Sequence, residues 1–382
     1  MAKPKVIAFY FPEFHETKEN NEWREKGFAG WTEVKTALPW YENHQQPKLP
    51  LEQNYYDQTD YRVQEWQSDL AEKYGINGFC YYHYWFNGKK PFEKPMQYML
   101  GNPRVMLPFC ICWANEPKLL TDQGYGGEED WKKHFDYLLP FFKDLRYIQV
   151  DKKPVFLIYN YHNIENGNEM LECFQKWAKE NGLPGLHIVS TIHSQRLDYV
   201  DGLNIDAFVQ FEPMYSLTHR LSFCRRVIKF IRRDILGGFI VSVFGWFVPF
   251  LRNIKYDFIH RKINEGLHFQ SEKLVYNGTF VNWDNTPNMG INSLIVHGGT
   301  PGKFAGYFGK TLDMAMQNNS EFVFLNAWNG WTEGAYLEPD CFDGYKYLEA
   351  VRSELTKRGL YEVGYCSAKY DYCLKPDWKY RL

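Results

Sequence analysis

The segment 326–339 holds two glutamates, Glu333 and Glu338, in a run rich in tryptophan and asparagine. A carboxylic acid can protonate a glycosidic oxygen, while amides bind sugar hydroxyls and indoles cover the sugar ring. Beside Trp328 and Trp331, desolvation should raise the pKa of Glu333, which suits a proton donor at neutral pH. Glu333 is therefore the first catalytic candidate, with a buried, hydrogen-bonded glutamate as the alternative. Glu338 fits a site or a scaffold equally well.

Polar and aromatic side chains also follow most other apolar runs of the chain. A single histidine at a strand end is more often a core residue than a catalyst. Carboxylates, imidazoles, amides and indoles at one rim together indicate a carbohydrate site, because solvated loops favour Lys, Ser and Gly over Trp. Glu116 joins Glu333 as a catalytic candidate. The residues assigned to substrate binding are Tyr10, Glu13, His15, Trp31, Glu33, His83, Tyr84, Trp85, Trp113, Asn115, Trp283, Asp284, Trp328, Asn329, Trp331 and Glu338.

Within this set, five indoles form the expected stacking platform and four side chains are expected to bind hydroxyls. For each tryptophan, burial in the core is an equally good interpretation. The platform consists of Trp31, Trp85, Trp113, Trp328 and Trp331. The hydroxyl-binding side chains are His15, His83, Asn115 and Asn329.

Other chemistries have weaker support. His83, His162, His193 and Asp284 could assemble a metal site, but no His-x-x-x-His or His-x-His pair places two ligands locally. No Walker loop occurs, and no Gly-x-Gly-x-x-Gly follows an apolar run, so we expect no cofactor. The eight cysteines include no Cys-x-x-Cys pair, and we expect free thiols in a reducing compartment.

The elements that must position these residues are eight short apolar runs separated by helical stretches. This alternation predicts parallel βα units, and eight buried strands predict a single (β/α)8 TIM barrel, whose active sites lie after the strands. We expect a catalytic barrel over 1–350 and a closing helix and tail over 351–382. Helices are expected over 62–73, 130–142 and 169–181. The strands are expected at 5–11, 76–85, 105–113, 154–160, 186–192, 207–211, 274–281 and 322–328.

Composition excludes one class of partner. The chain has 382 residues with 44 Lys and Arg against 46 Asp and Glu, a formal charge of −2. A protein that binds nucleic acid generally shows a clear basic excess, so no nucleic-acid partner is expected. Aromatic residues make up 18% of the chain, an excess that favours core packing with a share left for a sugar platform.

An amphipathic and apolar insertion of about 221–255 interrupts the pattern between strands six and seven. It begins with several arginines and a lysine, and residues 235–251 carry no charge. One interpretation is an insertion helix packed on the barrel. The other is peripheral contact with a membrane, since an apolar segment flanked by basic residues suits acyl chains beneath anionic headgroups. We expect surface attachment at the inner face of the plasma membrane, in an otherwise cytoplasmic protein.

Five motifs together resemble the WbsX-type family of bacterial polysaccharide-biosynthesis proteins, which is similar to the endo-α-mannosidase clan, glycoside hydrolase family 99. The resemblance implies a (β/α)8 barrel that acts on glycosides in O-antigen, lipopolysaccharide or capsule assembly. The motifs are IAFYFPEFH at 7–15, GFCYYHYWF at 78–86, FCICWANE at 109–116, WDNTP at 283–287 and NAWNGWTEGAYLEP at 326–339.

In the related hydrolases, the last strand carries a pattern resembling Asn-Glu-Trp-x-Glu-Gly. The resemblance implies that its second glutamate, the general acid, is Glu333. Its first glutamate, which deprotonates the sugar 2-hydroxyl, falls on Gly330, which offers no proton acceptor. Family members often have an acidic residue at Gly30 as well.

Three interpretations fit this missing base. The first and favoured one is a WbsX-type glycosyltransferase, acting on a lipid-linked or nascent glycan, with a sugar nucleotide as candidate donor. The second is a hydrolase or lyase whose base has moved to Glu116, Glu33 or Glu13. The third is a non-catalytic barrel that binds glycan.

Overall fold

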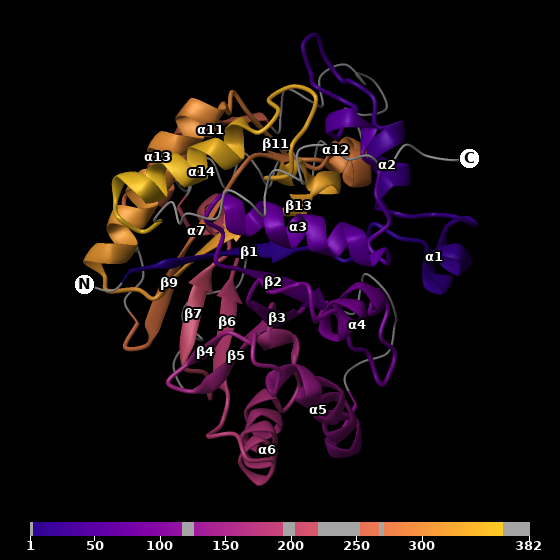
Figure 1. The fold of residues 1–382 in the computed structure, drawn as a ribbon, viewed down its shortest axis with the longest axis vertical. Helices are drawn as coiled ribbons and strands as arrows, with labels where there is room; N and C mark the ends of the chain where they lie inside the picture. The colour runs from indigo at the N-terminus through magenta and orange to yellow at the C-terminus, as the bar shows by residue number, and fades with distance from the viewer. Residues whose placement is uncertain (1–2, 117–125, 194–202, 221–252, 267–270, 362–382) are drawn as a thin grey trace, which may run out of the picture.

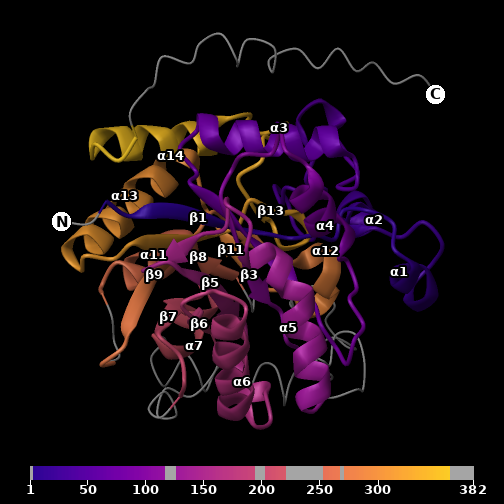
Figure 2. The same ribbon diagram turned by 60° about the horizontal axis from the view of Figure 1, so that its bottom comes forward.

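The computed structural model describes residues 3–116, 126–193, 203–220, 253–266 and 271–361. Within them, eight parallel strands follow one another around a barrel (Figures 1 and 2), and pairing of β3 with β5 closes it. All eight predicted strands, and the TIM barrel itself, are confirmed. The strands are β1 (Lys5–Tyr10), β2 (Gly78–His83), β3 (Phe109–Trp113), β5 (Lys153–Ile158), β6 (His187–Ile192), β7 (Ala207–Gln210), β9 (Leu274–Phe280) and β12 (Phe322–Asn326).

These strands form because their side chains are apolar or aromatic on both faces, as burial between a barrel interior and covering helices requires. Phe9 of β1 points inward, where its ring centroid lies 5.2 Å from that of Phe211 and 5.8 Å from that of Phe324. Tyr10 points outward, and its hydroxyl donates to Gln67 Oε1 at 2.7 Å. Alternate residues therefore have different surroundings, which decides what reaches the barrel mouth.

Helices cover the outside of the barrel. The three predicted helices are confirmed with shifts of one or two residues. Asp60 begins α3 by accepting a hydrogen bond from the Arg62 amide, as a helix N-cap does. In both ribbon views α13 lies beside α14 (Figures 1 and 2). The covering helices are α3 (Tyr61–Lys73), α4 (Lys94–Gly101), α5 (Glu128–Phe142), α6 (Gly167–Glu180), α7 (Met214–His219), α11 (Tyr256–Ile263), α13 (Pro301–Gln317) and α14 (Lys346–Lys357).

Short elements gather at the end of the barrel toward which the strands run (Figure 1). They comprise short helices after β1 and β9 and a three-stranded sheet. A hairpin that follows β12 completes the set, and together these elements enclose the mouth of the barrel. These elements are α1 (Lys18–Trp23), α2 (Gly30–Thr36), α12 (Thr286–Met289), the sheet β8 (Asn253–Lys255), β10 (Trp283–Asp284) and β11 (Ile295–His297), and the hairpin β13 (Asn329–Gly330) and β14 (Ala335–Tyr336).

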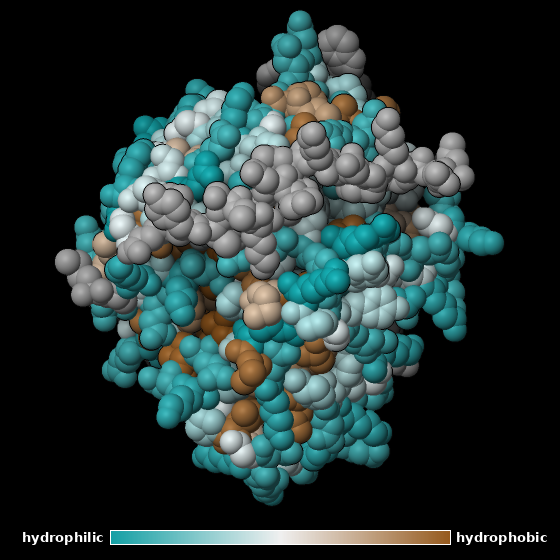
Figure 3. Space-filling view, viewed as in Figure 1, coloured by the Kyte–Doolittle hydropathy of each residue, from teal (hydrophilic) through white to brown (hydrophobic). Residues whose placement is uncertain are grey.

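The predicted membrane contact falls on residues 221–252, which lie outside the described residues, so it stays a prediction. The next three residues, 253–255, form β8 and pair with β11. Among the described helices, none has the length and hydrophobicity needed to cross a membrane. The face shown in Figure 3 is mostly hydrophilic, with hydrophobic residues in small separate patches. The closing helix α14 starts at Lys346, slightly before the expected boundary.

Candidate active site

Glu333 ends a short helical turn, η7 (Trp331–Glu333), inside the hairpin that follows β12. The residue is partly buried, and its Oε2 is enclosed without a hydrogen bond to any described residue. Burial, with the charge of Glu13 as the second cause, raises the pKa of Glu333 to about 8. The carboxyl is therefore mostly protonated at neutral pH and can donate a proton.

Glu13 lies near Glu333, in the loop that follows β1. The Thr332 hydroxyl donates a hydrogen bond to Glu13 Oε1 at 2.7 Å, which ties this loop to the residue next to Glu333. Burial raises the pKa of Glu13 to about 7; the hydrogen bond from Thr332 lowers it, and the charge of Glu33 raises it. Two carboxyls with raised pKa values therefore share the mouth of the barrel.

Two tyrosines stand next to these carboxyls. Burial raises the pKa of Tyr84, and the charges of Glu13 and Glu333 add to the rise. Burial also raises the pKa of Tyr159, with the charge of Glu116 as the next cause and that of Glu333 after it. Both tyrosines are half-buried, so each offers part of a ring and a hydroxyl to the mouth. Aromatic faces with polar tips are suited to sugar rings.

Glu116 is the third carboxyl of the mouth, directly after β3. Burial raises its pKa, and a hydrogen bond from Asn160 lowers it. The neighbouring Asn115 holds the same loop, because its amide donates to the Asn160 carbonyl at 2.6 Å and accepts from the Asn160 amide at 2.7 Å. Asn115 therefore positions Glu116, and its amide is already used within the protein.

Comparison with known proteins shows the family of this chain. Residues 6–351 match the model of the family described as glycosyltransferase WbsX. The chain belongs to the WbsX glycosyltransferase family. The WxcX protein of Xanthomonas campestris pv. campestris strain B100, described as uncharacterized, is 31% identical over 375 residues, 95% of this chain and 51% of WxcX. The chain thus spans about half the length of this relative.

Solved structures share the WbsX protein's fold. The GH99 endo-alpha-mannosidase from Bacteroides thetaiotaomicron aligns over 94% of this chain and 99% of its own, with a TM-score of 0.53 and 13% identity. A glycoside hydrolase-like protein aligns over 93% of this chain and 94% of its own, with a TM-score of 0.55 and 14% identity. At these identities the likeness shows the barrel fold.

Gly330, the position at which the resemblance places a base, sits where a side chain does not fit. It pairs with Ala335 across the hairpin β13–β14. A β-carbon on Gly330 would lie 2.6 Å from the Ala335 carbonyl oxygen and 3.2 Å from the Phe11 ring. Because the first contact is with backbone, a larger residue would have to displace the hairpin. This WbsX protein has a mouth built without a side chain at this position.

The five tryptophans of the predicted stacking platform are all at most 6% exposed, so the structure places them in the core, and their contact with sugar stays a prediction. Trp31 donates its indole N–H to the Tyr56 carbonyl, and Trp331 donates to Glu338, each at 2.7 Å. Trp85 stacks on His134 of α5 with ring centroids 4.6 Å apart. Trp113, at the end of β3, packs its ring against His134 of α5 with centroids 4.8 Å apart. The five residues of the platform are Trp31, Trp85, Trp113, Trp328 and Trp331.

Several predicted hydroxyl-binding residues are also used for structure. His83 Nε2 lies 3.0 Å from His134 Nε2, behind the barrel wall, and burial lowers its pKa to about 3. The side-chain amide of Asn329 makes two hydrogen bonds with the backbone of Phe11. It accepts from the Phe11 N–H at 2.8 Å and donates to the Phe11 carbonyl at 2.9 Å. Tyr10 points away from the mouth, as described above. These side chains have partners within the protein, and their assignment to substrate binding stays a prediction.

Asp284 holds the short elements together. It accepts hydrogen bonds from Gln46 Nε2 and the Thr286 hydroxyl, each at 2.8 Å, and its Oδ2 lies 2.8 Å from His44 Nε2. Burial raises its pKa, but the bond with His44 and other contacts outweigh this and leave the pKa below its usual value. The structure thus shows a structural role for Asp284, and its contact with sugar stays a prediction. The adjacent Trp283 is 4% exposed.

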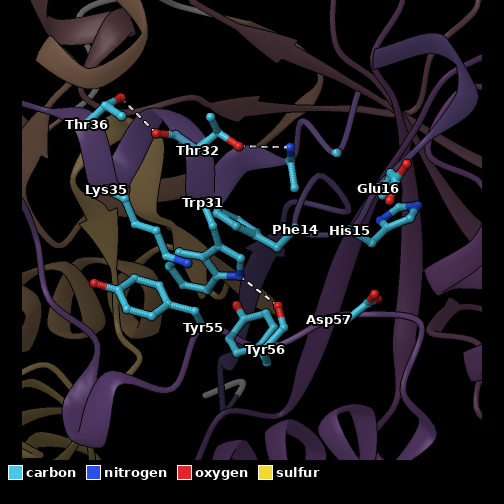
Figure 4. A pocket seen from close by; sticks show the side chains of 12 residues that line it. Phe14, His15, Glu16, Trp31, Thr32, Lys35, Thr36, Tyr55, Tyr56 and Asp57 are labelled. Atoms are coloured by element: carbon cyan, nitrogen blue, oxygen red, sulfur yellow. Dashed lines mark hydrogen bonds between the residues drawn. The ribbon is translucent and has the colours of Figure 1, made fainter. Parts of the chain in front are cut away.

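A cavity of about 380 Å³ opens beside α2 (Figure 4), lined partly by His15 and Trp31. His15 is buried, and burial lowers its pKa to about 4, so its ring is neutral. Lys35 extends over the Tyr55 ring, with Nζ 4.1 Å from the ring centroid. Trp31 contributes to the wall while its indole N–H is already bonded. The predicted ligands are thus divided between the mouth and this cavity.

Two side chains of the mouth were not among the predicted site residues. Tyr159 stands directly after β5 on the inward face, where alternation along 155, 157 and 159 could have located it. Thr332 has no such signal, because its bond to Glu13 joins residues far apart in the sequence.

Glu33, one of the predicted residues, lies on α2 with Oε1 3.7 Å from Arg24, and its pKa is raised by burial.

Proposed function

We propose that this protein is an enzyme of surface-polysaccharide assembly that breaks a glycosidic bond at the barrel mouth, with Glu333 as the proton donor. The observation that carries the proposal is the enclosed Glu333 carboxyl, with Oε2 unbonded and a pKa of about 8. A group that is protonated at neutral pH suits the donation of a proton to a leaving oxygen. The same pKa argues against Glu333 as a base toward an acceptor hydroxyl.

The proposed substrate is a lipid-linked or nascent glycan. Membership of the WbsX family supports a carbohydrate substrate, and Tyr84 and Tyr159 supply partly exposed rings and hydroxyls next to the acid. A sugar placed over these rings would bring its glycosidic oxygen toward Glu333. Glu116 borders the same space and is the second carboxyl that could contact substrate.

A glycosyltransferase that uses a sugar nucleotide is the second proposed function. The observation that favours it is the family's description as glycosyltransferase WbsX. In this case the departing group is a nucleotide, and the acceptor hydroxyl must lose its proton to a carboxylate of the mouth. The two proposals share a site and differ in donor and leaving group.

Product analysis separates them. Purified protein is incubated with a panel of α-linked oligosaccharides, α-mannosides included, with and without sugar nucleotides, and products are identified by mass spectrometry. New reducing ends without a nucleotide support the glycosidase, whereas elongation that requires a nucleotide replaces it with the transferase. Saturable binding with neither product, or equal product from Glu333→Gln, would overturn the role of Glu333 as an acid.

A further inference from the structure

We propose that Glu13 is the base that works with Glu333 and takes the proton from the hydroxyl that attacks the anomeric carbon. This inference deepens the proposed function and rests on it, because it assigns the second carboxyl of the same reaction.

Glu13 and Glu333 lie on loops that are next to each other and joined by a hydrogen bond. Glu13 follows β1 and Glu333 follows β12, and these two strands are neighbours in the barrel. The Thr332 hydroxyl bonds to Glu13 Oε1, and Thr332 precedes Glu333 in the chain. Among the described residues, the Glu13 carboxyl accepts this one hydrogen bond, so its Oε2 is left for a substrate hydroxyl. The two carboxyls are held by a shared short segment.

Two glycines, Gly30 and Gly330, determine which side chains fit near Glu333. A β-carbon on Gly30 would lie 2.8 Å from the Phe14 ring and 3.2 Å from Glu13 Cγ, so glycine at position 30 leaves Glu13 its place. Gly330 admits no side chain beside Ala335, as shown above. The space around Glu333 is therefore open to a carboxyl from the β1 loop and closed to one from position 330.

The other carboxyls that could act as the base have partners within the protein. Glu33 faces Arg24 at 3.7 Å, and Glu338 accepts three hydrogen bonds away from the mouth. Glu116 is bonded to Asn160. Within the part of the chain that the structure describes, Glu13 has no basic partner and accepts only the bond from Thr332, and its charge acts directly on Glu333.

The groups that face Glu13 come from three elements. Glu33 approaches from α2, Thr332 and Glu333 from η7, and Tyr84 from the end of β2. Negative neighbours disfavour a second charge, so one proton is retained by the pair over the neutral range. Glu13 accepts a hydrogen bond from Thr332, which favours its carboxylate, whereas Glu333 Oε2 has no donor among the described residues, so Glu333 keeps the proton and Glu13 is the ionised partner.

The proposed step transfers two protons, one from Glu333 and one to Glu13. The Glu333 carboxyl gives its proton to the leaving oxygen as the bond from that oxygen to the anomeric carbon breaks. The oxygen of the attacking hydroxyl forms the new bond to the same carbon, and its proton passes to the Glu13 carboxylate. Exchange with solvent then returns both carboxyls to their initial states.

The test compares Glu13→Gln with Glu22→Gln, an exposed glutamate of α1, on the substrate found in the product analysis. Loss of a general base predicts a fall in kcat/KM of about 100-fold or more for Glu13→Gln, and a change within about twofold for the control. The wild-type profile should rise near pH 7, and Glu13→Gln should lose this limb. Thr332→Val removes the bond that lowers the pKa of Glu13, so its limb should move to higher pH.

A substrate-free measurement accompanies the kinetics. The protonated-carboxyl stretch of Glu333, assigned by its loss in Glu333→Gln, is followed by infrared titration. Because the charge of Glu13 raises the pKa of Glu333, Glu13→Gln should lower it. An unchanged titration, or Glu13→Gln with wild-type kcat/KM, would overturn the inference while leaving the proposed function standing. Wild-type protein that turns over no glycan would instead remove the proposed function.

Discussion

Glu333 and Glu338 are enclosed carboxyls of one short segment, yet their surroundings are opposite. Glu338 accepts hydrogen bonds from Tyr56, Gln67 and Trp331 at 2.7–2.8 Å. Burial raises its pKa to about 7, and these three bonds lower it. Glu333 has an enclosed Oε2 with no described partner and a pKa of about 8.

The difference separates structural carboxyls from reactive ones. A buried carboxylate with a full set of donors stabilises the fold. Removing it leaves those buried donors without an acceptor. A buried carboxyl without donors costs stability, and such groups concentrate at functional sites. The partners of a glutamate therefore indicate its role better than its burial does.

The largest expected effect is on activity. Glu333→Gln removes the proton donor without removing a hydrogen-bond partner, so kcat should fall by about 100-fold or more while the free energy of unfolding is unchanged or higher. The measurement is turnover of the identified glycan together with chemical denaturation. Glu349→Gln, an exposed glutamate of α14, is the control. Retained activity would remove Glu333 from the reaction.

The second prediction reverses the pattern. Glu338→Ala leaves three buried donors without an acceptor, and each such group costs about 1–3 kcal/mol. We expect a loss of about 3 kcal/mol or more in the free energy of unfolding, measured by denaturant titration. Glu333→Ala is the matched control, with a much smaller loss. Equal losses in the two variants would break the comparison.

The third prediction concerns pH. The folded-state pKa of Glu333, about 8, is above its usual 4.5, so the folded protein holds a proton that the unfolded chain loses between these values. Glu333 therefore makes the free energy of unfolding fall as pH rises from about 4.5 to 8. Glu333→Gln removes that term, so its stability relative to wild type should increase across this window and level off above it. A difference independent of pH would contradict the raised pKa.

The sequence predicts the barrel well because the signals are local. Continuous apolar runs identify buried parallel strands, and the helical stretches between them end where hydrophobic periodicity ends. For β5, the expected strand 154–160 and the observed strand Lys153–Ile158 differ only at their ends. The position of the mouth follows from the fold, since TIM-barrel sites lie after the strands.

The surroundings of single residues could not be predicted in the same way. Moving by one residue along a strand changes the face that a side chain occupies, which put His83 and Trp113 against α5 instead of at the mouth. The donors of Glu338 and the bond between Glu13 and Thr332 join distant parts of the chain. Only the folded structure shows which glutamate is satisfied and which is not.

The smallest expected effect tests the indole itself. Trp331→Phe removes one of the three donors to Glu338 and keeps an aromatic ring stacked on Tyr336, whose centroid lies 3.8 Å away. The loss should be about 1 kcal/mol in the free energy of unfolding, with KM for the glycan unchanged. The matched variant Trp85→Phe removes the N–H that bonds Asp130 and should behave alike. A raised KM with unchanged stability would mean that these indoles contact sugar, because only a residue outside the core can lose binding without weakening the fold.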